Sequence, residues 1–242
     1  MPPGSTALPP LIAIVGCDGS GKSTVSEAIL DWVRGYGPAA AAHLGKQQGN
    51  TGRALSNLPV VGKPLGGFIG RKAATVRTSR TKNKSPSTFP ALVMYAFTLR
   101  RVRRFRRMLA LRRKGLIIVA DRYPQLDFPS AFDGPDLSVN AEGNRFVQWL
   151  AQREQHAFEW MTSHQPDLVI RLNVDLDTAF ARKPDHRREA LARKIEITPQ
   201  LTFNGANIVE IDASRPLAEV VAAAEAAVTR TLTECGYTRA RD

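Results

Sequence analysis

The chain has 242 residues, of which 43% are hydrophobic and 23% charged, a balance typical of a soluble globular protein with a sizeable core. No apolar run approaches the roughly 20 residues that a membrane-spanning helix needs, which excludes such a helix. Only two cysteines are present, Cys17 and Cys235, too few for a disulfide framework or a metal site. We therefore expect a cytoplasmic protein.

The positive charge is concentrated in one part of the chain. The formal net charge is +12, and nineteen of the 34 Lys and Arg residues lie between Trp32 and Ala120, where Asp and Glu do not occur. This excess favours anionic ligands, such as nucleotides, phosphate polymers or membrane surfaces, without selecting among them.

Strand-like and helix-like segments alternate along the sequence, which predicts a parallel sheet flanked by helices. We expect a disordered tail over residues 1–10 and a single domain over 11–242. Strands are predicted at 11–15, 39–44, 116–120, 168–174 and 208–211. Helices are predicted at 22–34, 89–114, 142–163, from 177 onward with a break near 183–185, and at 216–235. Residues 45–88 are predicted to form a long loop.

The segment from Gly16 to Ser23 matches the P-loop pattern G-x-x-x-x-G-K-[ST], between an apolar strand and a helix. Glycines allow successive N–H groups to face a phosphate, and the start of the helix adds a positive field. We expect Lys22 to reach the β- and γ-phosphates and the Ser23 hydroxyl to ligate Mg²⁺. The predicted nucleotide-binding residues are Gly16, Cys17, Asp18, Gly19, Ser20, Gly21, Lys22, Ser23 and Thr24.

Asp121 and Arg122 follow the strand predicted at 116–120. Ligands bind at the carboxyl edge of parallel sheets. We therefore expect Asp121 to orient Mg²⁺ or its water shell and Arg122 to hold an acceptor phosphate with its planar guanidinium. The alternative is that Asp121 caps a helix or a turn at the strand end. Tyr123 either flanks the acceptor or packs in the core.

Three segments resemble thymidylate kinase and its relatives: the P-loop, Val-Ala-Asp-Arg-Tyr at 119–123, and 166–175 followed by Ala-Phe-Ala-Arg at 179–182. The resemblance implies a P-loop three-layer α/β sandwich with five parallel strands in the order 2-3-1-4-5, and ATP and Mg²⁺ as cosubstrates. It further implies an arginine-rich lid at about 182–194 that closes on the transferred phosphoryl group, and an aspartate near the acceptor's sugar. On these positions the lid residues are Arg182, Arg187 and Arg188, and the aspartate is Asp18.

The chain departs from that family in two loops. His43-Leu-Gly-Lys-Gln-Gln replaces an Arg-Glu-Pro-Gly-like loop after the second strand, and Pro124-Gln-Leu-Asp-Phe replaces the run that reads the base. The chain therefore resembles a divergent member, and its acceptor is open.

A hydroxyl acceptor usually needs a general base, whereas a phosphate acceptor does not. Related nucleoside kinases carry that base just after the second strand, where this chain has no carboxylate; Asp18 or Asp121 could still serve. We therefore expect an ATP-dependent phosphotransferase acting on a nucleoside monophosphate or a similar phosphorylated small molecule. The alternatives are a kinase of a sugar or lipid, and a nucleotide-binding module that docks on an anionic surface.

The predicted catalytic residues are Lys22, Asp121, Arg122, Arg182, Arg187 and Arg188. The predicted acceptor-binding residues are Asp18, Arg53, Arg122 and Tyr123. Lys46, Arg71 and Arg77 are further candidates for phosphate contacts, and Ser23 and Asp121 are the predicted metal ligands.

Nine basic residues lie between Arg100 and Lys114 on the helix predicted at 89–114. They form a solvated helix face, a subunit contact in a homodimer, or an anchor for an anionic membrane or glycan. The last interpretation would place the protein at the inner face of a membrane. Trp149 and Trp160 are expected to pack in the core.

Overall fold

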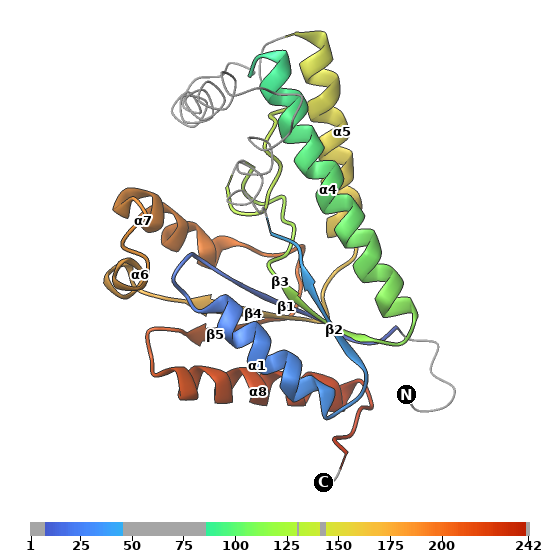
Figure 1. The fold of residues 1–242 in the computed structure, drawn as a ribbon, viewed down its shortest axis with the longest axis vertical. Helices are drawn as coiled ribbons and strands as arrows, with labels where there is room; N and C mark the ends of the chain where they lie inside the picture. The colour runs from blue at the N-terminus through green and yellow to red at the C-terminus, as the bar shows by residue number, and fades with distance from the viewer. Residues whose placement is uncertain (1–7, 46–85, 130, 141–143, 241–242) are drawn as a thin grey trace, which may run out of the picture.

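The computed structural model describes residues 8–45, 86–129, 131–140 and 144–240. Its centre is a sheet of five parallel strands in the order β2-β3-β1-β4-β5 (Figure 1). The strands are β1 (Leu11–Gly16), β2 (Ala39–His43), β3 (Ile117–Asp121), β4 (Leu168–Asn173) and β5 (Ile208–Asp212). The predicted α/β class and the predicted strand order are both confirmed.

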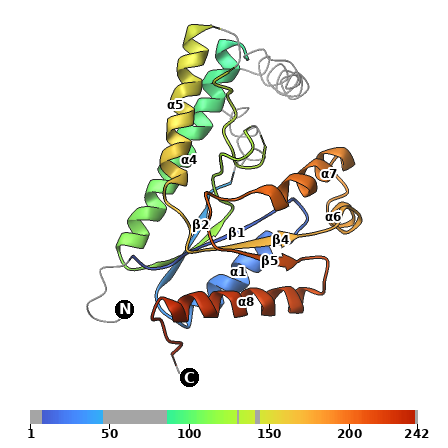
Figure 2. The same cartoon turned by 180° about the vertical axis from the view of Figure 1, so that it is seen from behind.

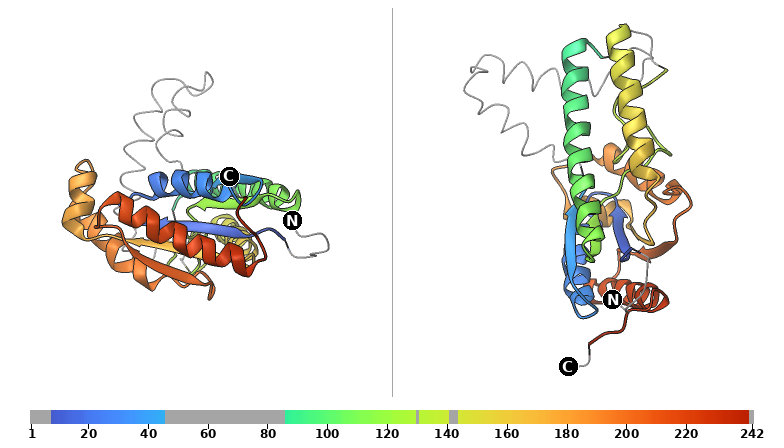
Figure 3. Two further views of the ribbon diagram at one scale, coloured as in Figure 1. Left: turned by 90° about the horizontal axis from the view of Figure 1, so that it is seen from below. Right: turned by 90° about the vertical axis from the view of Figure 1, so that its right-hand side faces the viewer.

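Helices cover both faces of the sheet, because the central strands are apolar on both sides. The helices α1 (Lys22–Arg34) and α8 (Leu217–Glu234) lie side by side on one face, as Figure 3 shows. The helices α4 (Thr88–Arg113) and α5 (Arg145–Thr162) cover the other face. Alternate residues of β1 divide between the two cores: Ile12 and Ile14 pack toward α1 and α8, and Leu11, Ala13 and Val15 toward α4 and α5.

The α4–α5 pair continues well beyond the sheet (Figure 2), with the N-terminal ends of both helices at its outer end. There a small core of its own holds the helices together, made of Ala91, Leu137, Val147, Leu150 and Ala151. The fully buried carboxylate of Glu154 lies between the helices. It accepts hydrogen bonds from Thr98 Oγ1 at 2.5 Å and from the backbone N–H of Leu137 at 2.6 Å.

The described part of the chain begins at Leu8, before the first predicted strand. Pro9 and Pro10 are buried, and Arg112 of α4 donates from Nε to the Pro9 carbonyl oxygen at 2.5 Å. Arg112 also pairs with Asp167 at 2.7 Å, and that carboxylate accepts from the backbone N–H of Leu11. Arg112 therefore fixes the entry to β1 and does not contribute to a solvated face.

The two tryptophans of α5 differ in their surroundings. Trp160 packs partly buried against Phe105, with ring centroids 5.5 Å apart, as predicted. Trp149 is 49% exposed, so the prediction that it lies in the core is wrong. It belongs to the part of α5 that extends past the sheet, where α4 is the helix that packs against it. None of the described helices is both long enough and apolar enough to cross a membrane.

Candidate functional site

The segment between β1 and α1, residues 17–21, forms a tight loop. Gly19 and Gly21 have φ angles of +88° and +83°, which favour glycine. A Cβ atom at Gly16 would lie 2.6 Å from the Leu172 carbonyl oxygen. No side chain caps the N-terminus of α1, since its cap residue is Gly21. The N–H groups of its first turn are therefore available to an anion.

The Lys22 side chain reaches back into this loop and is only 7% exposed. Its ammonium donates a hydrogen bond to the Cys17 carbonyl oxygen. Burial, together with the nearby Arg122 guanidinium, lowers the pKa of Lys22 to about 8. Bound phosphate would offset the cost of burying this charge, so the loop favours an anionic ligand.

Asp121 lies at the end of β3, beside the last residue of β2. One of its carboxylate oxygens, Oδ2, is 2.8 Å from His43 Nδ1. The other, Oδ1, is buried and has no hydrogen-bond partner among the described residues. A hydrated Mg²⁺ would satisfy this oxygen, and the Ser23 side chain, exposed on the first turn of α1, supplies a second oxygen ligand. The residues present therefore fit Mg²⁺.

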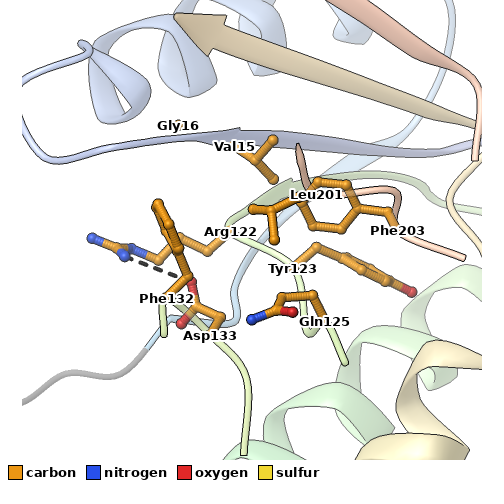
Figure 4. Close-up of a pocket in the computed structure, with 9 residues that line it drawn as sticks. All are labelled: Val15, Gly16, Arg122, Tyr123, Gln125, Phe132, Asp133, Leu201 and Phe203. Atoms are coloured by element: carbon orange, nitrogen blue, oxygen red, sulfur yellow. Dashed lines mark ion pairs between the residues drawn. The ribbon is translucent and has the colours of Figure 1, made fainter. Parts of the chain in front are cut away.

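Arg122 joins the loop to two carboxylates. It has a φ of +69°, an uncommon conformation for a side-chain-bearing residue, and its Nη2 lies 3.0 Å from Asp18 Oδ1. Its Nη1 lies 3.6 Å from Asp133 Oδ2, the ion pair drawn in Figure 4. Burial alone would lower the pKa of Arg122, but Asp133, Asp18 and Asp121 outweigh it and raise the pKa.

Asp133 is held from its other side by α4. The Arg101 guanidinium donates to the Asp133 carbonyl oxygen and to its Oδ1, both at 2.8 Å, and both residues are buried. Arg104, one turn further, donates to the carbonyl oxygens of His43 at 3.2 Å and Gly45 at 2.9 Å. The helix therefore fixes both the end of β2 and the acid that pairs with Arg122.

The segment predicted to form a lid, at about 182–194, runs from the last residue of α6 (Leu176–Arg182) into α7 (Arg188–Ile197). Arg182 donates to the carbonyl oxygens of Gly19 at 3.2 Å and Ala213 at 2.9 Å, so it contacts the loop directly. Arg187 and Arg188 instead pair with carboxylates of the lid segment itself, Glu189 and Asp177.

Lys194 of α7 is a contact that sequence reasoning missed. Its ammonium donates a hydrogen bond to Asp18 Oδ2, and His186 Nε2 lies 3.8 Å from the same oxygen. Burial alone would raise the pKa of Asp18, but Lys194, Arg122 and Lys22 outweigh it and lower the pKa well below its ordinary value. Asp18 therefore links α7 to the loop and to Arg122.

A small pocket lies beside the loop, between the segment after β3 and the segment after the short 3-10 helix η2 (Thr198–Gln200) (Figure 4). Its lining residues are Val15, Gly16, Arg122, Tyr123, Gln125, Phe132, Asp133, Leu201 and Phe203. Its free volume of about 10 Å³ is about the space that one water molecule needs. A molecule larger than one water would have to move these segments apart to enter the pocket.

Two polar side chains hold the segments that line the pocket. Gln125 is buried and donates from Nε2 to the carbonyl oxygens of Phe128 and Ala131, both at 2.9 Å. Asp127 accepts from the backbone N–H of Thr202 at 2.7 Å and from its hydroxyl at 2.8 Å. The Tyr123 ring lines the pocket, whereas its hydroxyl donates away from it, to the His164 carbonyl oxygen.

Comparison with known proteins gives relatives that match over nearly the whole chain. The uncharacterized ATP-binding protein YghS of Escherichia coli (strain K12) is 43% identical over 219 residues, 90% of this chain and 92% of the relative. The chain belongs to the family of YghS. YghR of the same strain, also named an uncharacterized ATP-binding protein, is 36% identical over 223 residues, 92% of this chain and 88% of that relative. No family model matches the sequence.

In this member of the YghS family, five predicted site residues meet at the carboxyl edge of the sheet: Asp18, Lys22, Asp121, Arg122 and Arg182. Cys17 lies buried in the loop, and burial raises the pKa of its thiol, which disfavours a nucleophile. Ser20 donates to the Cys17 carbonyl oxygen at 2.9 Å, and Thr24 is exposed on α1. The predicted contacts Lys46, Arg53, Arg71 and Arg77 lie outside the described residues.

Proposed function

We propose that the chain binds ATP with Mg²⁺ in the P-loop and transfers the γ-phosphoryl group to a small, already phosphorylated acceptor, such as a nucleoside monophosphate. The observation that carries this proposal is the convergence of three cations, Lys22, Arg122 and Arg182, on one glycine-rich loop at an uncapped helix start. The names of YghS and YghR, as ATP-binding proteins, support the nucleotide.

Each residue has a distinct role in this proposal. Lys22 and the N–H groups at the start of α1 hold the triphosphate. Ser23 and Asp121 would hold Mg²⁺, which would supply positive charge beside the phosphates. Arg122 binds the acceptor phosphate, and Arg182 stabilises the charge of the transferred group from the lid, with Arg187 and Arg188 joining on further closure. Catalysis then consists of positioning and charge neutralisation, without a general base.

A second candidate, a kinase of a hydroxyl acceptor such as a sugar or lipid, is favoured by one contact. The His43 imidazole lies at the end of β2, where related nucleoside kinases carry their base, and is oriented by Asp121 at 2.8 Å. Sequence reasoning considered carboxylates alone at this position and therefore overlooked it. A hydroxyl acceptor would place its proton within reach of this ring.

The experiment is ADP release by the full chain with ATP and Mg²⁺ across nucleoside monophosphates, sugar phosphates and unphosphorylated alcohols. The controls are Lys22→Ala, which removes the phosphate-binding cation, and His43→Asn, which keeps a side chain that can bond to Asp121. A phosphate acceptor requires turnover that depends on Lys22 and survives His43→Asn within about tenfold.

Turnover with an alcohol that falls by about a hundredfold or more in His43→Asn would replace the first candidate by the second. ATP binding without turnover on any acceptor would contradict both, and would leave a nucleotide-binding module.

A further inference from the structure

The outer end of the α4–α5 pair exposes an apolar surface. Six of the eight large hydrophobic side chains that are exposed in the described part of the chain belong to this region. This tip patch consists of Phe89, Leu92, Leu99, Val139, Phe146 and Trp149, each 41% to 55% exposed. Single exposed hydrophobic residues are ordinary, but a cluster at one end of a molecule indicates an interaction surface.

The same face of α4 becomes basic toward the sheet. The six basic residues of the helix that are exposed form a basic stripe: Arg100, Arg103, Arg106, Arg107, Arg113 and Lys114. None of them forms an ion pair with a described acidic residue. The other three basic residues of this run, Arg101, Arg104 and Arg112, turn inward to the contacts described above.

Helix geometry places the leucines of the tip patch and the basic stripe on one side of α4, and Trp149 on the adjoining side of α5. Leu92, Leu99, Arg106 and Arg113 recur every seven residues and so lie nearly in one line along α4. The Arg106 guanidinium lies 5.5 Å from the centre of the Trp160 ring. The side of α5 that bears Trp160 therefore lies next to this line of residues on α4. Trp149 lies three turns before Trp160 on the same side of α5.

Two exposed aromatic residues of the tip patch lie against each other, with an arginine beside them. Trp149 stacks on Phe146 with ring centroids 5.8 Å apart, and the Arg153 guanidinium lies 5.7 Å from the centre of the Trp149 ring. Tryptophan and arginine side chains of this kind combine an apolar body with a polar end, and they are enriched where hydrocarbon meets headgroups.

We propose that this surface docks on a bilayer rich in anionic phospholipid. The tip patch enters the boundary between headgroups and acyl chains, and the basic stripe binds the anionic headgroups. A second copy of the chain fits less well, because it would bring two sets of six unpaired cations together. Nucleic acid would match the charge but would leave the leucines without a partner. The proposal is independent of the acceptor and of the kinase reaction.

The experiment is sedimentation of the full chain with vesicles of phosphatidylcholine alone and with vesicles of equal parts phosphatidylcholine and phosphatidylglycerol. Three cations of the stripe are removed together in Arg100→Gln/Arg103→Gln/Arg107→Gln. A matched control removes three exposed cations near α1 and α8 in Arg34→Gln/Arg215→Gln/Arg230→Gln. The stripe variant should bind about a hundredfold more weakly, since each basic residue near an anionic leaflet contributes a factor of about five. The control variant should bind within about fivefold of the wild type.

The tip patch is tested in Leu99→Ser/Trp149→Ser, with the exposed Leu217→Ser of α8 as its control. Only the tip variant should lose binding to phosphatidylglycerol vesicles. On binding, the tryptophan emission of the wild type should shift to the blue, and that of Trp149→Phe should not. Equal loss in both charge variants would overturn the proposal. So would a dimer in sedimentation equilibrium that Leu99→Ser/Trp149→Ser dissociates, or binding to an oligonucleotide in preference to anionic vesicles.

Discussion

Replacing Arg101 by methionine tests whether the ion pair behind Arg122 holds the site together. Arg101 and Asp133 are both buried, with side chains 3% and 6% exposed, and two hydrogen bonds of 2.8 Å join them. Methionine keeps an apolar side chain but removes the charged guanidinium, whose central carbon lies 5.4 Å from the centre of the Phe158 ring.

The expected cost follows from what is left behind. Removing one partner of a buried pair costs about 3–5 kcal/mol, because the other charge stays buried. Asp133 keeps a second cation, Arg122 at 3.6 Å, so we expect the lower end, about 3 kcal/mol. For a chain of this size each kcal/mol lowers the melting temperature by about 2–4 °C, so Tm should fall by about 10 °C.

The assay is urea unfolding followed by circular dichroism, with Arg103→Met as the control. Arg103 is exposed on the same helix, and its replacement should change the free energy of unfolding by less than about 0.5 kcal/mol. Adding Asp133→Asn to Arg101→Met should cost at least about 1 kcal/mol less than the sum of the single variants. A loss below about 1 kcal/mol in Arg101→Met, or strict additivity, would refute the reasoning.

Three further predictions follow from other contacts. Gly134→Ala places a Cβ 2.6 Å from Gln125 Nε2 and 2.8 Å from the Phe128 carbonyl oxygen, and urea unfolding should show a loss of about 1–3 kcal/mol; an unchanged midpoint would contradict the packing. Asp18 has a pKa below its ordinary 3.8 in the folded protein, so its charge contributes stability above that pH which is lost on acidification. Asp18→Asn should therefore be less stable at neutral pH, with a shallower acid unfolding curve, and a parallel curve would argue against this. Lys194→Met should raise amide exchange in α7 by no more than about fivefold, because a partly exposed ion pair is worth at most about 1 kcal/mol; a much larger rise would mean that this pair holds the lid.

The parts of the site that lie on contiguous residues could be predicted from the sequence. The P-loop is a local sequence pattern between a strand and a helix. The strand β1 is apolar on both of its faces, and this predicts a parallel sheet covered by helices on both sides. Asp133 and Lys194 could not be predicted, because they reach the site through loop and lid geometry, which leaves no periodic signal. The residues that Asp133 and Lys194 contact lie far from them in the sequence, so no local pattern indicates these contacts.

In the arginine-rich helix α4, the spacing of the residues indicates which arginines point inward, although its charged residues all carry the same charge. Arg101 and Arg112 are three turns apart on the face that also bears Phe105 and Met108, and this spacing indicates inward positions. Trp149 failed for a different reason. Its helix is amphipathic, but its outer half extends past the sheet, so no layer covers that side chain. Periodicity predicts which side of a helix is apolar but not how far its neighbours extend.

The central claim, that the loop around Lys22 is an ATP site, is tested most directly by calorimetric titration of the full chain with ATP and Mg²⁺. We predict saturable binding that Lys22→Met weakens by at least about tenfold, since a charge-assisted contact to phosphate is worth about 1.5–3 kcal/mol. Binding should also weaken when EDTA removes Mg²⁺. Saturable binding that is unchanged in Lys22→Met, or no binding by the folded wild type, would contradict it.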